Sequence, residues 1–147
     1  QGKRPVMVWL HGGGFSSGSG NWLLYDGSRL ATNQDVVVVT VTHRLNIFGH
    51  LYLAGLGGEQ FADSGNAGLL DIIGVLQWVR DNAAAFGGDA GNVTLFGQSG
   101  GAGKVTTLMA MEGAKGLFHR AIAMSGAAIA GLKPEQATAN AEKLLIQ

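Results

Sequence analysis

The chain has 147 residues, enough for one domain with a hydrophobic core. Its ten basic and ten acidic side chains cancel, so net charge indicates neither nucleic acid nor an anionic membrane as a partner. It has no cysteine, which excludes disulfides, thiolate metal sites and a cysteine nucleophile. The longest apolar runs fall far short of the roughly 20 residues that a membrane-spanning helix needs.

The chain has a low proportion of charged residues for an independent domain. Only 14% of its residues are charged, against roughly 25% in an average soluble domain, and 46% are hydrophobic. It opens on Gln1 just before a predicted strand and closes on a predicted helix that runs to Gln147. We therefore expect residues 1–147 to be the central part of one domain truncated at both ends, which leaves cellular compartment and oligomeric state open.

Four short runs show the continuous hydrophobicity of strands buried in a parallel sheet, at 6–10, 36–41, 93–97 and 121–124. Helices are predicted at 67–86, with Asn66 as a possible cap, at 101–111, and after Pro134. The segment 46–65 is expected to be a long glycine-containing loop. This alternation of strands and helices predicts an open α/β sheet with helices on both faces.

The strongest chemical signal is the run Gly97-Gln98-Ser99-Gly100-Gly101, which leaves a predicted strand and enters a predicted helix. In that setting the pattern G-x-S-x-G is typical of a nucleophile elbow. A sharp turn strains the serine backbone and crowds the residues two positions either side, where glycine avoids a collision. Ser99 would sit at the positive end of the following helix. We interpret it as a nucleophile; the alternative is an incidental serine in a glycine-rich turn.

A second signal, His11-Gly12-Gly13-Gly14-Phe15, follows the first predicted strand directly. Consecutive glycines let backbone N–H groups point into one small space, as an oxyanion hole requires. Loops of this type act together with the N–H of the residue after the nucleophile, here Gly100. Without the downstream elbow, the same glycines would be read equally well as a flexible loop.

The partners that would activate Ser99 are not evident in the sequence. A triad on this elbow follows the order serine, acid, histidine, and the residues after Ser99 hold no aspartate and one histidine, His119. Glu112 and His119 have the right order, but His119 begins a strand at the end of the sheet opposite Ser99. His11, His43 and His50 precede the serine, and the latter two are expected to be structural. The base and acid are therefore expected outside this chain.

No metal or cofactor is expected. Gly103 and Lys104 follow a strand as in a phosphate-binding loop, but that motif requires glycine and Ser or Thr where Gln98 and Val105 stand.

Together these residues resemble the type-B carboxylesterases, which include cholinesterases, bile-salt lipases and bacterial p-nitrobenzyl esterases. The bacterial branch is nearest, and the resemblance covers the chain up to about Gly131. It rests on the blocks PVMVWLHGGGF, YDGSRLA, VVVVTVTHRLNIFGHL, NAGLLDIIGVLQWVRDNAAAFGGDAGNVTLFGQSGGAGK and GLFHRAIAMSG.

The resemblance implies an α/β-hydrolase fold and a serine carboxylic-ester hydrolase that acts on small esters through an acyl-enzyme. It implies Ser99 as nucleophile and the N–H groups of Gly13, Gly14 and Gly100 as the oxyanion hole. It also implies that Ser125 hydrogen-bonds the catalytic acid, although a turn serine is an equal interpretation. A non-catalytic binding or adhesion relative is the alternative function; such relatives usually lose the nucleophile. A lactonase or amidase on the same elbow also stays open.

Overall fold

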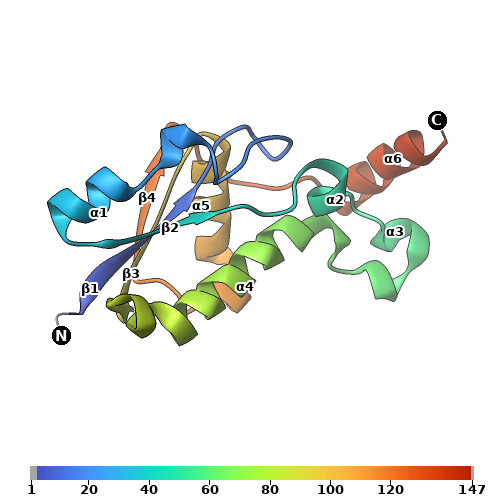
Figure 1. Cartoon of the computed structure of the whole chain (residues 1–147). Helices are drawn as coiled ribbons and strands as arrows, with labels where there is room; N and C mark the ends of the chain where they lie inside the picture. The colour runs from blue at the N-terminus through green and yellow to red at the C-terminus, as the bar shows by residue number, and fades with distance from the viewer. Residues whose placement is uncertain (1–2, 147) are drawn as a thin grey trace.

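The computed structural model describes residues 3–146, and its centre is one parallel sheet (Figure 1). The strands lie in the order β2-β1-β3-β4, and every neighbouring pair is parallel. Their bounds are Arg4–Leu10 for β1, Val37–Val41 for β2, Gly88–Gln98 for β3 and Arg120–Met124 for β4. All four predicted strands are present. Strand β3 begins well before 93, because Gly88 pairs with Arg4 and the polar residues that follow continue the extended backbone.

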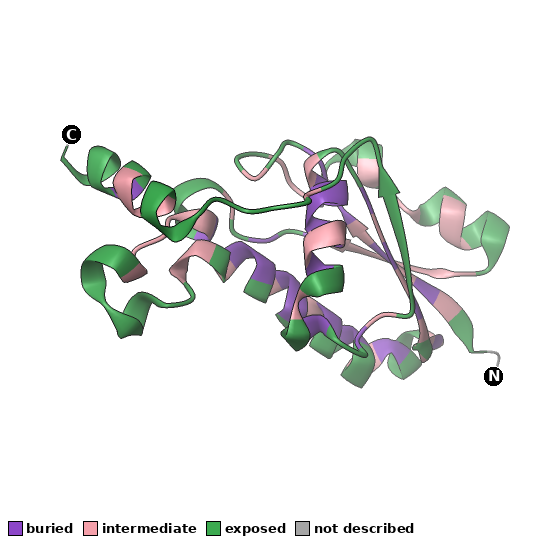
Figure 2. Cartoon of the chain, turned by 180° about the vertical axis from the view of Figure 1, so that it is seen from behind, coloured by how far each residue is buried: buried purple, intermediate pink, exposed green. Residues whose placement is uncertain are grey.

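The central strand β1 shows how the sequence divides between the two faces of the sheet. Val6, Val8 and Leu10 are fully buried, whereas Met7 and Trp9 on the opposite face are only partly covered. The buried face packs against the apolar stripe of α4 (Ala67–Asn82) and against α5 (Gly100–Ala110). The core is therefore formed on one side of the sheet, as the buried residues in Figure 2 show. Its α4 and α5 members include Leu69, Ile72, Ile73, Leu76, Val79, Val105 and Leu108.

Helices lie on both faces of the sheet, as the alternation predicted. Helix α1 (Ser28–Gln34) lies above the strands in Figure 1, and α4 lies below them. The predicted helix 67–86 is α-helical as far as Asn82 and continues as a 3₁₀ turn, Ala83–Phe86. Asn66 occupies the position before α4, but its side chain makes no capping hydrogen bond, so the predicted cap is wrong. The predicted helix 101–111 is α5, shifted by one residue.

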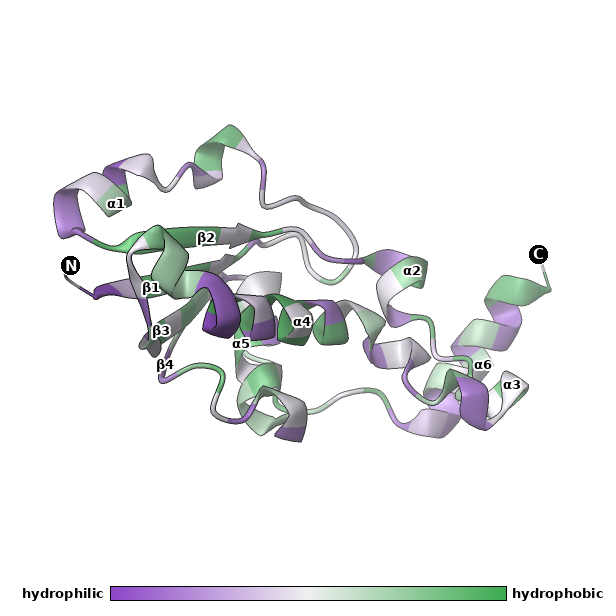
Figure 3. Cartoon of the chain, turned by 60° about the horizontal axis from the view of Figure 1, so that its bottom comes forward, coloured by the Kyte–Doolittle hydropathy of each residue, from purple (hydrophilic) through white to green (hydrophobic). Residues whose placement is uncertain are grey.

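The segment 46–65 is not the long loop that the sequence predicted. It forms two short helices, α2 (Asn46–His50) and α3 (Ala54–Gly57), and 3₁₀ turns at Glu59–Phe61 and Ser64–Asn66. Helices of four or five residues are too short to show a hydrophobic period, which explains the error. Helix α3 lies against α6 (Pro134–Leu145) at one end of the molecule (Figure 3). The helix ends at Leu145 and Ile146 is a turn residue, so the predicted continuation is wrong at position 146; Gln147 lies outside the described residues.

Two further 3₁₀ turns, Leu23–Tyr25 and Glu112–Ala114, complete the regular structure. Within residues 3–146, no helix combines the length and apolarity needed to cross a bilayer.

Gly74 offers a simple test of the α4 assignment. It is exposed in the middle of the helix, and a Cβ added there would meet nothing within 4 Å. A Gly74→Ala substitution should therefore raise the free energy of unfolding by about 0.5–1 kcal/mol, because alanine loses less backbone entropy in a helix. Urea denaturation of the two proteins measures this, and a destabilised variant would contradict the assignment.

Candidate active site

Ser99 occupies a strained turn between β3 and α5. Its backbone angles are φ 54° and ψ −119°, a combination that residues other than glycine rarely adopt and that costs on the order of 1–3 kcal/mol. The turn is held from both sides: the Ser99 N–H donates to the Met124 carbonyl at 2.8 Å, and the Gly103 N–H donates to the Ser99 carbonyl at 3.0 Å. The Ser99 side chain is exposed at the carboxyl ends of the strands.

The glycines that flank Ser99 are required by close backbone contacts. A Cβ on Gly97 would lie 2.6 Å from the carbonyl carbon of Gly101 and 2.8 Å from the Leu10 oxygen. A Cβ on Gly101 would overlap the Leu10 oxygen. The collision between positions 97 and 101 is the one that the sequence predicted. The contact of both glycines with the end of β1 was not predictable, because it depends on the pairing of β1 with β3.

The glycine loop after β1 lies directly against this turn. Gly13 and Gly14 have φ values of 93° and 62°, a backbone region that favours glycine. A Cβ on Gly100 would lie 2.5 Å from Gly14 Cα, and a Cβ on Gly12 would lie 3.6 Å from the Ser99 Cβ. The structure thus brings together the three glycines and the serine that the sequence selected, although residues 14 and 100 are far apart in the chain.

The carbonyl groups and the N–H groups in this part of the structure differ in their hydrogen bonding. Each carbonyl from Gly12 to Phe15 accepts a hydrogen bond, and the donors, in chain order, are His11 Nδ1 at 2.7 Å, Ser17 N at 3.1 Å, Lys104 Nζ at 2.5 Å and Asn46 N at 2.8 Å. In contrast, no hydrogen bond among residues 3–146 uses the N–H of Gly13, Gly14 or Gly100 as donor. These three amides therefore have no hydrogen-bond acceptor among the described residues.

Ser125 lies beside the turn, immediately after β4. Its backbone has φ 55°, and its neighbours Met124 and Gly126 both touch the Ser99 backbone. A Cβ on Gly126 would lie 2.5 Å from the Ser99 carbonyl oxygen. The side chain is exposed, and its link to a catalytic acid stays a prediction.

The four histidines at positions 11, 43, 50 and 119 make no hydrogen bond to Ser99 in this structure. His119 lies at the amino end of the strands, where its Nδ1 accepts the Val93 N–H at 3.1 Å and its own N–H donates to the Val93 carbonyl. His11 and His43 are buried and stack on one another, with ring centroids 5.0 Å apart. Within residues 3–146, the Ser99 hydroxyl has no hydrogen-bond partner among the histidines.

Burial keeps three histidines uncharged beneath the glycine loop. It lowers the pKa of His43 to about 4 and lowers the pKa of His11 and His50 as well, and the cationic Lys104 acts in the same direction. His11 and His43 each turn Nδ1 towards a carbonyl oxygen, of Gly12 and Arg44, so Nδ1 carries the proton. No local pattern indicates that these three histidines form one cluster with Lys104, because the four residues come from separate segments. Within residues 3–146, no three side chains are placed to hold a metal ion.

Comparisons with known proteins agree with this geometry. The model of the Carboxylesterase family matches residues 1–145. The chain belongs to the carboxylesterase family. It is 49% identical over 142 residues to the para-nitrobenzyl esterase of Bacillus subtilis, covering 97% of this chain and 28% of that protein. It is 44% identical over 148 residues to liver carboxylesterase 1 of Oryctolagus cuniculus, covering 100% of this chain and 25% of that enzyme.

The crystal structure of the Geobacillus stearothermophilus carboxylesterase EST55 at pH 6.8 superposes with a TM-score of 0.95 at 48% identity. The match covers 99% of this chain and 32% of that one. This confirms the predicted α/β-hydrolase fold and the resemblance to the bacterial branch of the family. The carboxylesterase chain described here spans between a quarter and a third of these relatives' length.

A Gly101→Ala substitution tests the contact between the turn and β1. The added methyl group would overlap the Leu10 carbonyl oxygen, so the turn must move away from the sheet. We expect a loss of stability on the order of 3 kcal/mol, measured by urea denaturation. Stability within 1 kcal/mol of the unsubstituted protein would show that the turn can adjust.

A His43→Phe substitution tests the buried histidine. The pKa of His43 is about 4 in the folded protein and 6.5 when unfolded, so the unfolded state binds the proton more readily between these values. The free energy of unfolding therefore carries no penalty from His43 above pH 6.5. It falls as the pH drops from 6.5 towards 4, by on the order of 3 kcal/mol, because the unfolded state takes up the proton first. Denaturation midpoints measured from pH 7 to 4 should fall less steeply in the variant. Parallel curves would contradict the assignment.

Proposed function

We propose that this chain carries half of the active site of a serine carboxylic-ester hydrolase, with Ser99 as the nucleophile. The observation that supports this most is the juxtaposition of an exposed, strained Ser99 with three backbone N–H groups that have no partner among residues 3–146. The strained serine at a helix start is costly, and acyl transfer uses both this serine and the unpaired amide donors beside it. Membership of the carboxylesterase family supports the same reaction class.

The reaction proceeds in two acyl-transfer steps. Ser99 Oγ bonds to the ester carbonyl carbon while its proton passes to a general base, and the carbonyl oxygen becomes an oxyanion. The N–H groups of Gly13, Gly14 and Gly100 bind that charge, and the amino end of α5 favours it further. The tetrahedral intermediate then breaks the carbon–oxygen bond to the alcohol, which leaves with a proton from the base. Water attacks the acyl-enzyme in the same manner and releases the acid.

We propose further that residues 1–147 are the central part of one α/β-hydrolase domain, and that the base and acid lie in the remainder. Every residue of β4 is exposed, including Ile122 and Met124, so this edge of the sheet has an uncovered apolar strand (Figure 2). Such an edge normally pairs with a further strand or is covered.

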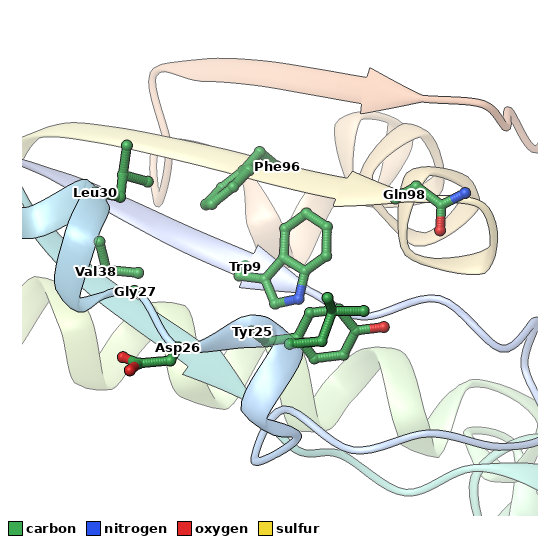
Figure 4. A pocket seen from close by; sticks show the side chains of 9 residues that line it. Trp9, Tyr25, Asp26, Gly27, Leu30, Val38, Phe96 and Gln98 are labelled. Carbon is green, nitrogen blue, oxygen red and sulfur yellow. The ribbon is translucent and has the colours of Figure 1, made fainter.

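The face of the sheet opposite the core supports the same proposal. There a cavity of about 400 Å³ is lined by Trp9, Tyr25 and Phe96 and opens next to Gln98 (Figure 4). The Trp9 ring lies 4.9 Å from Phe96 and 5.2 Å from Tyr25. The buried Trp9 Nε1 has no partner among residues 3–146. An apolar surface of this kind is expected where a further layer of the domain packs.

The substrate class that this site favours is a small carboxylic ester. The relatives that carry ester-hydrolase names, from Bacillus subtilis and Oryctolagus cuniculus, support this choice. The pockets for the acyl and alcohol groups would be completed by the remainder of the domain.

A comparison of the full-length protein with the 147-residue chain tests the proposal. The full-length protein should hydrolyse p-nitrophenyl acetate and be labelled by a fluorophosphonate at Ser99. A Ser99→Ala variant should lose both, with turnover reduced by at least about 10⁴-fold. The 147-residue chain should show no turnover at the level of a complete triad, because it lacks the base. Ser99-dependent turnover by the short chain alone would contradict the placement of the base, and labelling of another serine would contradict the nucleophile.

A further inference from the structure

Lys104 is a fully buried cation whose place in the fold is unexplained by the reaction described so far. It lies on α5, one helical turn after Gly100, and none of its side chain reaches solvent. Among residues 3–146, its ammonium forms no ion pair with a carboxylate. A buried charge without an opposite charge is costly unless it is hydrogen-bonded, so its hydrogen bonds indicate what it does.

The hydrogen bonds of Lys104 join the two halves of the proposed oxyanion hole. Nζ donates to the Gly14 carbonyl at 2.5 Å and reaches the Gly100 carbonyl at 3.4 Å. Nζ also lies 4.6 Å from the centre of the Phe15 ring, which covers it from the loop side. The glycine loop and the serine turn therefore meet at one ammonium group, through one carbonyl oxygen from each.

This contact restrains a loop that has little rigidity of its own. Three consecutive glycines have the largest backbone entropy to lose on ordering, and Gly13 and Gly14 have no side chains through which to be held. The loop is instead fixed through its carbonyl groups, and Lys104 supplies the bond at Gly14, the residue in contact with Gly100. The Gly14 carbonyl shares its peptide plane with the Phe15 N–H, so fixing this carbonyl restrains the Gly14 Cα, which joins that plane to the peptide group carrying the Gly14 N–H.

Lys104 is charged at neutral pH, whereas the three histidines near it are not. His11, His43 and His50 face the same interior and are uncharged there, because burial and the nearby ammonium lower their pKa values. Burial also lowers the pKa of Lys104 to about 8, so the ammonium form still predominates at pH 7. An ammonium group in a region of low dielectric adds a positive potential where negative charge would develop during acyl transfer.

We propose that Lys104 is a positioning residue of the oxyanion hole: it holds the Gly14 carbonyl against the serine turn, so that the amides of Gly13, Gly14 and Gly100 are ordered before substrate binds. The proposal rests on the esterase function proposed above.

The test uses the full-length protein and three variants. Lys104→Met keeps the length and apolar stem of the side chain but removes its hydrogen bonds, and Lys104→Gln keeps an N–H donor without the charge. Thr107→Val is the matched control: it removes a hydrogen bond to Gly103 on the same helix and touches neither glycine loop nor serine. Steady-state kinetics on p-nitrophenyl acetate, thermal unfolding, and inhibition by a trifluoromethyl ketone, which forms a tetrahedral adduct, are measured for each.

Lys104→Met should lower kcat by about 100-fold, the loss typical of one oxyanion-hole donor, and leave KM within about threefold. Affinity for the ketone should fall by a similar factor, and Lys104→Gln should lose less in both measurements. Thr107→Val should keep kcat and ketone affinity within about twofold of the unsubstituted enzyme. This separation identifies an effect on the transition state, which a general loosening of the fold does not produce.

A folded Lys104→Met protein with kcat and ketone affinity within threefold of the original would overturn the proposal. So would a Thr107→Val protein with the same losses. If the methionine variant does not fold, the glutamine variant decides on the same criteria: a lower kcat and weaker ketone binding at constant KM support the positioning role, and unchanged values overturn it. If the unsubstituted full-length protein shows no esterase activity, the proposed function fails, and ketone binding then cannot support the positioning role.

Discussion

The close contact between the serine turn and the end of β1 governs the rest of this structure. Gly97 and Gly101 approach the Leu10 carbonyl so closely that neither position has room for a side chain. The same contact brings the start of α5 against the glycine loop that continues from Leu10, and so places Gly100 next to Gly14. One steric requirement therefore sets both the backbone strain at Ser99 and the distance between the serine and the free amides. The buried α4 and α5 face of the sheet supports this contact from below.

The carbonyl groups and the N–H groups of the glycine loop have different roles. Its carbonyl groups are held by a histidine, a lysine and two backbone amides, whereas the amides of Gly13 and Gly14 donate no hydrogen bond among residues 3–146. A loop with ordinary side chains could be anchored through them, but glycines can be anchored only through the backbone. This need explains the burial of His11 and Lys104, two polar groups that a hydrophobic core would otherwise exclude.

The sequence predicted those parts of the fold and site that depend on local pattern. Continuous apolar runs predicted the four strands, and the G-x-S-x-G pattern between a strand and a helix predicted the turn at Ser99. What it missed depends on contacts between distant segments. The early start of β3 arises from pairing with Arg4, the helices of 46–65 are too short for a period, and Asn66 does not cap α4. Around Lys104 the local pattern indicates only an incomplete phosphate-binding motif, and nothing local indicates that its ammonium reaches Gly14.

The separation of these contacts along the chain also has a consequence for folding. Lys104 Nζ lies 2.5 Å from the Gly14 carbonyl oxygen, although the two residues are 90 positions apart in the chain. Strands β1 and β3 are neighbours in the sheet, but α1, β2 and α4 lie between them in the sequence. Closing such a loop costs entropy before its contacts repay it, so this pairing forms late relative to the helices. Gly14 and Ser99 come together only when β1 and β3 pair, so we expect a newly made chain to have no partly formed site before this part of the parallel sheet is assembled.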